Sequence, residues 1–254
     1  MEKTAIVVGT GNVAYHLTKA LLEAGVDVLM VYGRSQQTTE WLGRHLNVKV
    51  TSDWNQLPST ASYYLYAISD NALPEVLSYP LAPEAIHLHT AGSIGLEVFP
   101  VHKPRHGVLY PLQTFSKTKQ LDFKEVPLFV EASSMAILDE IRQLAATIAY
   151  HVNESNSTQR RQLHLAAVFA CNFVNHMYAI SDELVRSSGL PFEVLKPLIA
   201  ETASKITLLS PREAQTGPAV RGDSSVMDKH KILLENFPSY KLLYEMLSSS
   251  ISNF

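Results

Sequence analysis

A glycine-rich turn directly after a short apolar segment is the feature that most limits how this chain can fold. Residues 4–8 (Thr-Ala-Ile-Val-Val) have the continuous apolar character of a strand buried on both faces of a parallel sheet. The turn at Gly9 and Gly11 follows at once, and residues 13–24 then place apolar side chains at helical spacing, up to Gly25. This order predicts the first half of a βαβ unit, in which a strand leads through a tight turn into a helix.

The turn fits the pattern Gly-x-Gly-x-x-Ala, from Gly9 to Ala14. In such a turn the first glycine permits the bend, the second lets the backbone approach a diphosphate, and the small last residue lets helix and strand pack closely. The first helical N–H groups and the positive end of the helix dipole then face the phosphates. A glycine turn without a ligand is the alternative, but its place after a buried strand favours a dinucleotide. The residues predicted to contact the dinucleotide here are Gly9, Thr10, Gly11, Asn12 and Val13.

Strand and helix patterns alternate through the first 150 residues or so and then stop. Further strands are predicted at 26–32, 48–51, 63–68, 85–89, 107–110 and 128–131, and further helices at 38–46 and 136–149. Such alternation implies right-handed βαβ units and a parallel sheet with helices on both faces. The predicted fold is α/β, a Rossmann-type doubly wound, mainly parallel sheet in residues 1–152, followed by an all-helical C-terminal domain in residues 153–254.

The end of the second predicted strand indicates which dinucleotide would bind. NAD-binding units carry an Asp or Glu there, about 20 residues after the glycines, for the ribose 2′-hydroxyl. This chain instead reads Val-Tyr-Gly-Arg-Ser at 31–35, and its nearest acid, Asp27, lies at the other end of the strand. Arg34 and Ser35 could bind a 2′-phosphate. NADP(H) is therefore favoured over NAD, the alternative being that Arg34 is a solvated loop residue. The missing acid also argues against an S-adenosylmethionine methyltransferase.

The second domain is predicted to start with a polar segment, 153–158, and one long helix, 159–187. Apolar positions recur along this helix at a 4-3-4-3 spacing interrupted at Ser181: Leu163, Ala167, Ala170, Val174, Met177 and Leu184. Such a stripe packs against other helices, either of the same chain or of a second subunit. We expect a homodimer built on this helix and keep packing within the chain as the alternative.

Composition and charge exclude several other classes of protein. With 21 Lys and Arg against 24 Asp and Glu, the net charge is −3, so no basic surplus indicates nucleic acid. Cys171 is the single cysteine, which rules out an intrachain disulfide and a cysteine-based metal cluster. The ten histidines include the pairs 87/89 and 102/106 but form no H-E-x-x-H motif, so no metal is expected. We expect neither a signal peptide nor a membrane-spanning stretch. We expect a cytoplasmic location.

Four stretches carry a resemblance to a known family: the Gly9 turn, residues 89–93 (His-Thr-Ala-Gly-Ser), residues 107–115 and residues 216–223. Through them the chain resembles the DUF2520 family, which pairs a Rossmann-like domain with a helical C-terminal domain. It is also similar, more distantly, to pyrroline-5-carboxylate reductase, ketopantoate reductase, prephenate dehydrogenase and 6-phosphogluconate dehydrogenase. The resemblance spans nearly the whole chain and implies a family of NADP oxidoreductases without a settled substrate.

The resemblance also implies where the cofactor would lie. NADPH would cross the carboxyl ends of the strands, with its nicotinamide facing a cleft between the domains. Residues 68–70 stand where relatives carry a loop beside the ribose and phosphate, and residues 89–93 where relatives line the nicotinamide pocket. Further cofactor contacts are thus expected from Ile68, Ser69, Asp70, His89, Thr90 and Gly92.

For the proton-transfer residues, the resemblance implies a lysine and, one turn later, an asparagine on the first long helix of the second domain, as in several relatives. This chain has Asn172 but carries Val168 at the lysine position. At 100° per residue, His164 lies about 80° around the helix from Asn172. We therefore predict His164 as the acid or base and Asn172 as a catalytic substrate anchor, with Asn175 nearby. A hydrogen-bonded histidine in a helix interface is the alternative for His164.

The turn at 216–223 (Thr-Gly-Pro-Ala-Val-Arg-Gly-Asp) and Gln113 complete the predicted substrate site. Arg221 would bind a substrate carboxylate; the alternative is an Arg221–Asp223 pair that fixes the turn. The predicted function is hydride transfer between NADP(H) and a small anionic carbonyl, imine or hydroxy substrate. The alternative is a noncatalytic NADP(H)-binding regulatory protein, which Val168 favours and the polar residues His164, Asn172 and Arg221 disfavour.

Overall fold

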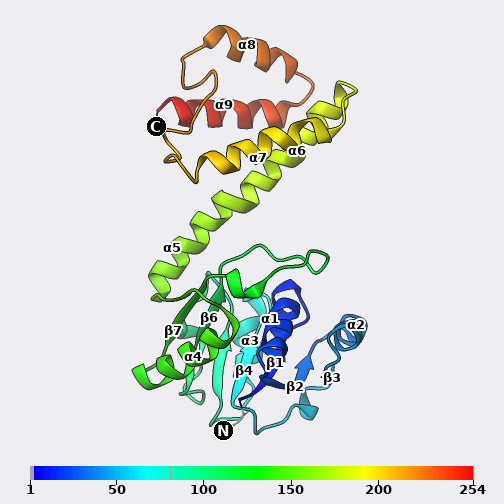
Figure 1. Ribbon diagram of the computed structural model, residues 1–254, viewed down its shortest axis with the longest axis vertical. Coiled ribbons are helices and arrows are strands. Elements are labelled where there is room, and N and C mark those ends of the chain that lie inside the picture. The colour runs from blue at the N-terminus through cyan, green and yellow to red at the C-terminus, as the bar shows by residue number, and fades with distance from the viewer. Residues whose placement is uncertain (1–2, 81, 254) are drawn as a thin grey trace. The chain divides into compact units, whose positions relative to one another are not determined.

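The computed structural model describes residues 3–80 and 82–253 and forms two compact units, Met1–Cys171 and Asn172–Phe254 (Figure 1). The first unit is built in the order β1 (Thr4–Val8), α1 (Asn12–Glu23), β2 (Asp27–Tyr32), α2 (Gln36–Leu46), β3 (Val50–Thr51), β4 (Tyr63–Tyr66), α3 (Leu73–Ser78), β5 (Ile86–His89), β6 (His106–Pro111), β7 (Leu128–Ala132), α4 (Met135–Ile148) and β8 (Val152–Glu154). The helix α5 (Ser157–Ala167) follows and also belongs to this unit. The boundary predicted after residue 152 thus falls inside β8, and the compact unit continues through α5.

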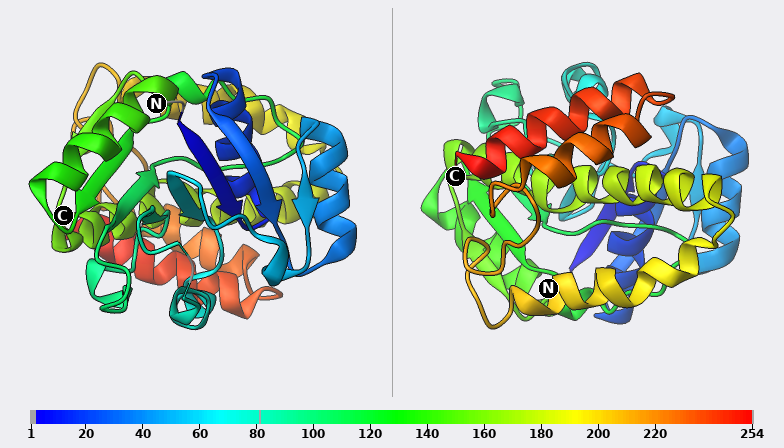
Figure 2. Two further views of the ribbon diagram at one scale, coloured as in Figure 1. Left: turned by 90° about the horizontal axis from the view of Figure 1, so that it is seen from below. Right: turned by 90° about the horizontal axis from the view of Figure 1, so that it is seen from above.

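The eight strands form one sheet in the order β3-β2-β1-β4-β5-β6-β7-β8 (Figures 1 and 2). Every neighbouring pair is parallel except β6 and β7, which are antiparallel. The predicted α/β fold with a mainly parallel sheet is confirmed. The strand order reverses at β1, whose neighbours are β2 and β4, and in open sheets of this kind ligands bind at that switch point, beyond the carboxyl ends of the strands.

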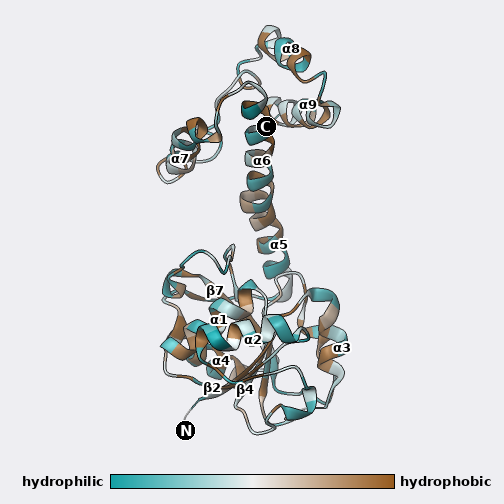
Figure 3. Cartoon of the chain, turned by 90° about the vertical axis from the view of Figure 1, so that its right-hand side faces the viewer, coloured by the Kyte–Doolittle hydropathy of each residue, from teal (hydrophilic) through white to brown (hydrophobic). Residues whose placement is uncertain are grey.

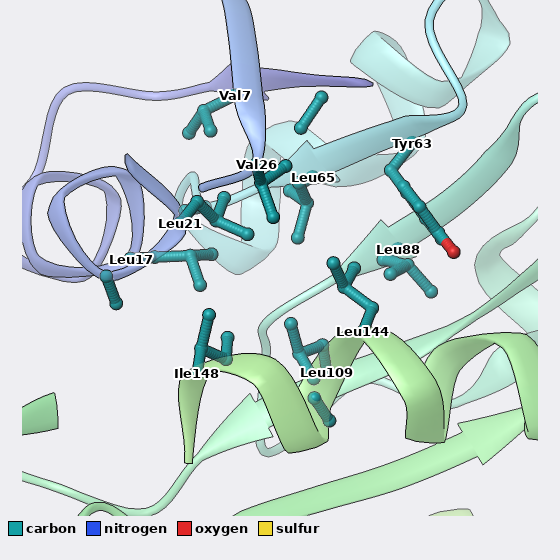
Figure 4. Close-up of a cluster of buried hydrophobic side chains, with 14 of the residues drawn as sticks. Val7, Leu17, Leu21, Val26, Tyr63, Leu65, Leu88, Leu109, Leu144 and Ile148 are labelled. Carbon is teal, nitrogen blue, oxygen red and sulfur yellow. The ribbon is translucent and has the colours of Figure 1, made fainter. Parts of the chain in front are cut away.

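Alternate side chains of the central strands enter two separate apolar layers, one on each face of the sheet. On one face, Val7 and Leu65 pack with Leu17 of α1 and Leu144 of α4 (Figure 4). On the other face, Ile6, Tyr64 and Tyr66 pack with Leu73 and Leu77 of α3. Burial on both faces explains why the strands read as continuous apolar runs, which appear brown in Figure 3.

The first turn of α5 is fixed to the sheet by a buried ion pair. The side chain of Arg160 is 0% exposed; it pairs with Glu131 of β7 and donates to the carbonyl of Ile94. Glu131 also accepts from the N–H of Ser157 at 2.9 Å, while Asn156 caps the helix in a capping box. These contacts join α5, the strand β7 and the loop after β5.

The second unit consists of helices alone within the described residues. A π-helical segment (Val168–Phe173) follows α5 without a break and leads into α6 (Val174–Ser187). The remaining helices are α7 (Lys196–Lys205), α8 (Ser224–Leu233) and α9 (Pro238–Ser252). Many of its large apolar side chains are exposed, among them Leu198, Leu208, Ile232, Leu242 and Met246. The predicted all-helical C-terminal region is confirmed.

The helix over Ser157–Ser187 is long and apolar enough to cross a membrane by length and composition, and none of the tested window is buried. The sequence-based expectation that no stretch has this length was therefore too strict. Length and composition do not separate a membrane span from a helix that packs against other helices, because both require a continuous apolar surface.

We predict that Arg160→Ala destabilises the protein by about 3–5 kcal/mol, because it leaves the Glu131 carboxylate with little solvent and without its cation. Urea denaturation measures this change. Lys19→Ala serves as the control, since Lys19 and Glu23 form an exposed pair across 3.7 Å whose loss should cost less than about 0.5 kcal/mol. Equal, small effects of the two substitutions would contradict the structural role of Arg160.

Candidate functional site

The turn between β1 and α1 is held tightly against its neighbouring strands. Gly9 has φ +130°, and a Cβ at this position would lie 2.1 Å from the carbonyl oxygen of Ala67. The N–H of Gly9 donates to the backbone carbonyl of Tyr32 at 2.8 Å. Both the backbone conformation and the close approach require glycine, so the first glycine of the motif shapes the turn against β2 and the end of β4.

Gly11 differs from Gly9 because its surroundings are open. It is the N-cap residue of α1, with an ordinary φ of −73° and no side-chain cap, and a Cβ here would meet nothing within 4 Å. The first N–H groups of α1 are therefore left without a side-chain acceptor. An uncapped helix start beside an open glycine is the arrangement that accepts a phosphate group.

These residues form one end of a cavity of about 850 Å³ that lies within the first unit. Its wall follows the carboxyl ends of β1, β2, β4, β5 and β6 and reaches α5. The predicted residues on the wall are Gly9, Thr10, Gly11, Asn12, Val13, Arg34, Ser35, Ile68, Ser69, Asp70, Thr90, Gly92, Gln113 and His164. The switch point of the sheet and the cavity therefore coincide, as expected for this fold.

At the end of β2 the cavity wall carries a cation and no acid. Arg34 is exposed there, and Ser35 caps α2, its hydroxyl accepting from the N–H of Thr38 at 3.5 Å. The start of α2 thus adds its dipole to the charge of Arg34. Asp70 is the single acid among the described residues that line the cavity, and its carboxylate is hydrogen-bonded to Ser93, beside β4 and β5.

A loop after β6 is tied to the glycine turn and to α1 by three hydrogen bonds, which the sequence did not indicate. Lys117 Nζ donates to the carbonyl of Thr10 at 2.7 Å, and Asn12 Nδ2 donates to that of Phe115 at 2.9 Å. His16 lies 2.9 Å from the carbonyl of Ser116. Asn12, predicted to contact the cofactor, fixes this loop across the start of α1.

At its other end the cavity is lined by a tyrosine and a histidine in direct contact. The Tyr110 hydroxyl of β6 lies 3.1 Å from Nδ1 of His164 on α5, and the two rings meet edge to face. A Cβ on Gly92 would lie 2.7 Å from the His164 ring, so this glycine leaves the space that the imidazole fills. Tyr110 was not among the predicted site residues, because 54 residues separate it from His164.

His89 does not line the cavity, in contrast to the expectation from the 89–93 motif. Its side chain is fully buried and stacks on Phe99. Burial, with a smaller contribution from the charge of Arg160, lowers the pKa of His89 to about 3. His89 is the last residue of β5 and packs inside the protein, whereas Thr90, Ala91 and Gly92 of the loop that follows lie on the wall. We therefore correct His89 from a cofactor contact to a packing residue.

Three predicted residues belong to the helical unit: Asn172, Asn175 and Arg221, all of them exposed. The 100° per residue used to relate Asn172 to His164 does not hold, because Asn172 lies in the π-helical segment, where each turn contains more residues. In the turn before α8, Asp223 caps the helix by accepting from Val226 at 3.2 Å. The described residues show no ion pair between Arg221 and Asp223.

Groups of three or more potential metal ligands do not occur among the residues that the structure describes. His87, the partner of His89 in the predicted pair, is buried and contacts the Tyr66 hydroxyl at 2.9 Å and the carbonyl of Ala82 at 3.1 Å. Burial lowers its pKa to about 4, with a smaller effect from Lys103. His87 is thus a hydrogen-bonded core histidine.

Comparison with known proteins shows the same fold over the whole chain. The model of the domain of unknown function DUF2520 matches residues 126–251. The structure of a "putative NADP oxidoreductase" from Bacteroides fragilis is 41% identical, covers 100% of this chain and 99% of its own, and superimposes with a TM-score of 0.95. None of the curated proteins matches significantly.

More distant structures share the fold. An imine reductase from Myxococcus stipitatus in complex with NADP+ is 14% identical, covers 98% of this chain and 93% of its own, and has a TM-score of 0.71. A 1-pyrroline-5-carboxylate reductase from Streptococcus pyogenes is 13% identical, covers 99% of this chain and 98% of its own, and has a TM-score of 0.65. From the full-length match at 41% identity and the domain match together, the chain belongs to the DUF2520 family of Rossmann-type oxidoreductase-like proteins.

Proposed function

We propose that this protein is an NADP(H)-dependent oxidoreductase. The observation that carries this proposal is a single cavity that has an uncapped helix start at one end and the Tyr110–His164 pair at the other. The first end suits a diphosphate, and the second offers hydroxyl and imidazole groups for proton transfer. Its volume of about 850 Å³ is in the range of ligand and cofactor sites.

The cavity residues fit NADP(H) in one direction. Gly11 and the start of α1 would hold the diphosphate, and Arg34 with Ser35 would hold the 2′-phosphate of the adenosine half. The nicotinamide would then face Thr90 and Gly92. Support comes from the charge of Arg34 and the lack of an acid at the end of β2. It also comes from two relatives, one described as an NADP oxidoreductase and one bound to NADP+.

Bound NADPH would supply a hydride, so the protein must supply a proton and anchor the substrate. His164 is half-buried on the cavity wall, where it can exchange protons with solvent. Gln113, also on the wall, offers an amide to the substrate. We assign Asn172, Asn175 and Arg221 of the helical unit to substrate binding, with Arg221 directed at a carboxylate.

The proposed substrate is a small anionic carbonyl, imine or hydroxy compound. Structures of similar fold include an imine reductase and a 1-pyrroline-5-carboxylate reductase. The compound named in the second, 1-pyrroline-5-carboxylate, has both an imine and a carboxylate group. The alternative is a noncatalytic NADP(H)-binding regulatory protein. Val168, at the position where several relatives carry a lysine, favours this alternative, whereas the hydrogen-bonded Tyr110 and His164 favour an enzyme.

We also propose that the protein is a homodimer built on the long helix. The stripe formed by Leu163, Ala167, Ala170, Val174, Met177 and Leu184 contains no buried residue in the single chain. Ala170 is exposed and the other five residues are half-buried, so the stripe keeps apolar surface open to solvent, as protein interfaces do. A second copy of the helix would cover it through knobs-into-holes packing.

The cofactor prediction concerns Arg34. NADPH should bind more tightly than NADH, and Arg34→Ala should weaken NADPH binding about 10–100-fold, because a charged hydrogen bond to the 2′-phosphate is lost. NADH affinity should not change. Isothermal titration calorimetry with both nucleotides measures these effects.

Gly11→Val provides the control for that titration. Because a Cβ at Gly11 meets nothing within 4 Å, the variant should fold normally yet bind neither nucleotide. Equal affinity of the wild-type protein for NADPH and NADH would contradict the assignment of Arg34.

The enzymatic prediction is that the protein oxidises NADPH with at least one substrate of the proposed class. A screen of small keto acids, aldehydes and cyclic imines, with and without a carboxylate, would follow NADPH absorbance. Arg221→Ala should raise KM mainly for the carboxylate-bearing substrates, and Lys229→Ala, on the following helix, is its control. A protein that binds NADPH but oxidises it with none of these compounds would support the regulatory alternative.

The assembly prediction is that light scattering at micromolar concentration gives twice the mass of a single chain. Met177→Glu places a charge in the stripe and should shift the protein towards the monomer. Gln162→Glu, at an exposed position of the same helix, should not change the mass. A wild-type monomer under these conditions would exclude the proposed dimer.

A further inference from the structure

We propose that Tyr110 is the residue that passes the proton to the substrate, and that His164 acts through it as a positioning and reprotonating group. The inference rests on the proposed oxidoreductase function and names the proton donor within the same site. It changes the sequence-based prediction, which gave the donor role to His164 directly. Three observations support it: the contact between the two side chains, the packing of Gly92 against His164, and the positive charge of the buried Arg160 near Tyr110.

Tyr110 is held more rigidly than His164. It lies near the end of β6, in the sheet, and is 7% exposed, while still contributing to the cavity wall. His164 is less buried and is carried by a helix. A proton donor must stay within hydrogen-bond reach of the reacting atom, and a side chain anchored in a strand meets this requirement better.

The hydrogen bond between the two residues has one productive direction. A phenol has a single proton, so Tyr110 can offer it to a substrate only when it does not donate it to His164. Nδ1 of His164 must then carry a proton and donate it to the phenol oxygen across 3.1 Å. In this arrangement His164 directs the Tyr110 proton into the cavity, and its Nε2 is free to exchange protons.

The position of His164 is set by two neighbouring features of the chain. Gly92 lies so close that a Cβ would approach the imidazole to 2.7 Å, which means that a larger residue would move the ring. Arg160, one helical turn before His164, is locked to Glu131 and to the Ile94 carbonyl. These contacts fix the helix face on which His164 approaches Tyr110.

Arg160 also favours the deprotonated form of the proposed donor. Burial raises the pKa of Tyr110, while the nearby charge of Arg160 acts in the opposite direction. Since Arg160 is fully buried, solvent screens this attraction weakly. The phenolate that arises when Tyr110 loses its proton is thereby stabilised before the proton is replaced.

The proposed step balances as a reduction of a C=N or C=O bond. Bound NADPH would supply the hydride for the new C–H bond, so that the π electrons of the substrate bond would move to its nitrogen or oxygen. That atom takes the Tyr110 hydroxyl proton. Tyr110 recovers a proton from Nδ1 of His164 while Nε2 takes one from solvent, and proton exchange of the imidazole with solvent then restores the Nδ1–H tautomer. The net change is the uptake of one hydride and one proton by the substrate.

The test compares Tyr110→Phe with Tyr150→Phe, a control at a tyrosine that is 68% exposed and does not line the cavity. With the best substrate of the wild-type protein, Tyr110→Phe should lower kcat about 10²–10⁴-fold, the usual size of a general-acid contribution. NADPH affinity should remain unchanged. The kcat of the wild-type protein should also fall in D2O, because the Tyr110 hydroxyl exchanges its proton for a deuteron.

The role of His164 is tested by His164→Asn and His164→Gln. Asparagine places an N–H close to the position of Nδ1, whereas glutamine places it close to that of Nε2. If His164 acts through Tyr110, His164→Asn should retain at least about tenfold more activity than His164→Gln, an orientation effect of one hydrogen bond. If His164 were the direct donor, both variants should lose activity equally and Tyr110→Phe should have little effect.

The outcomes separate this inference from the proposed function. An active wild-type protein whose kcat changes less than threefold on Tyr110→Phe would overturn the role of Tyr110 and leave the oxidoreductase function intact. A wild-type protein that binds NADPH but reduces no compound of the screen would overturn both. Loss of NADPH binding in Tyr110→Phe would also count against a donor role, because it would show that Tyr110 holds the cofactor.

Discussion

One end of the cavity is formed by Tyr110 and His164, and we call it the chemical end. This end depends on the buried ion pair between Arg160 and Glu131. The ion pair takes two charges out of water and offsets that cost through a close contact and further hydrogen bonds, to Ile94 and Ser157. The pair fixes the first turn of α5 on β7, one helical turn before His164. Without it, the hydrogen bonds between Ser157 and Glu131 would still attach the start of α5 to β7, but the approach of His164 to Tyr110 would be held less firmly.

The two ends of the cavity are built in different ways. The end where we propose the diphosphate, the phosphate end, consists of backbone: a glycine turn that requires Gly9, the open position at Gly11 and the first N–H groups of α1. The chemical end consists of side chains brought from β6, the loop after β5 and α5. Backbone groups serve a ligand part that many oxidoreductases share, whereas side chains can vary with the substrate.

The sequence predicted the strand, the glycine turn and the helix that follows it well, because their determinants are local. Strand, turn and helix follow one another within residues 4–24, and each glycine has a physical reason that the pattern itself expresses. The chemical end was harder, since the partners Tyr110 and His164 are 54 residues apart and meet only through the sheet and α5. His89 was assigned wrongly because the 89–93 motif does not show that β5 ends at His89, so that His89 packs inside the protein and only the loop after it reaches the cavity. The π-helical turns around Asn172 and the short strand β8 leave no clear pattern in the sequence.

A crystal structure of the protein with NADP+ tests the central claim most directly. We predict the diphosphate at the start of α1, the 2′-phosphate within hydrogen-bond distance of the Arg34 guanidinium, and the nicotinamide ring beside Gly92. The Tyr110 hydroxyl should then lie within reach of a substrate atom placed over C4 of the nicotinamide. A nicotinamide bound at the Arg34 end, or one separated from Tyr110 by protein atoms, would contradict the account.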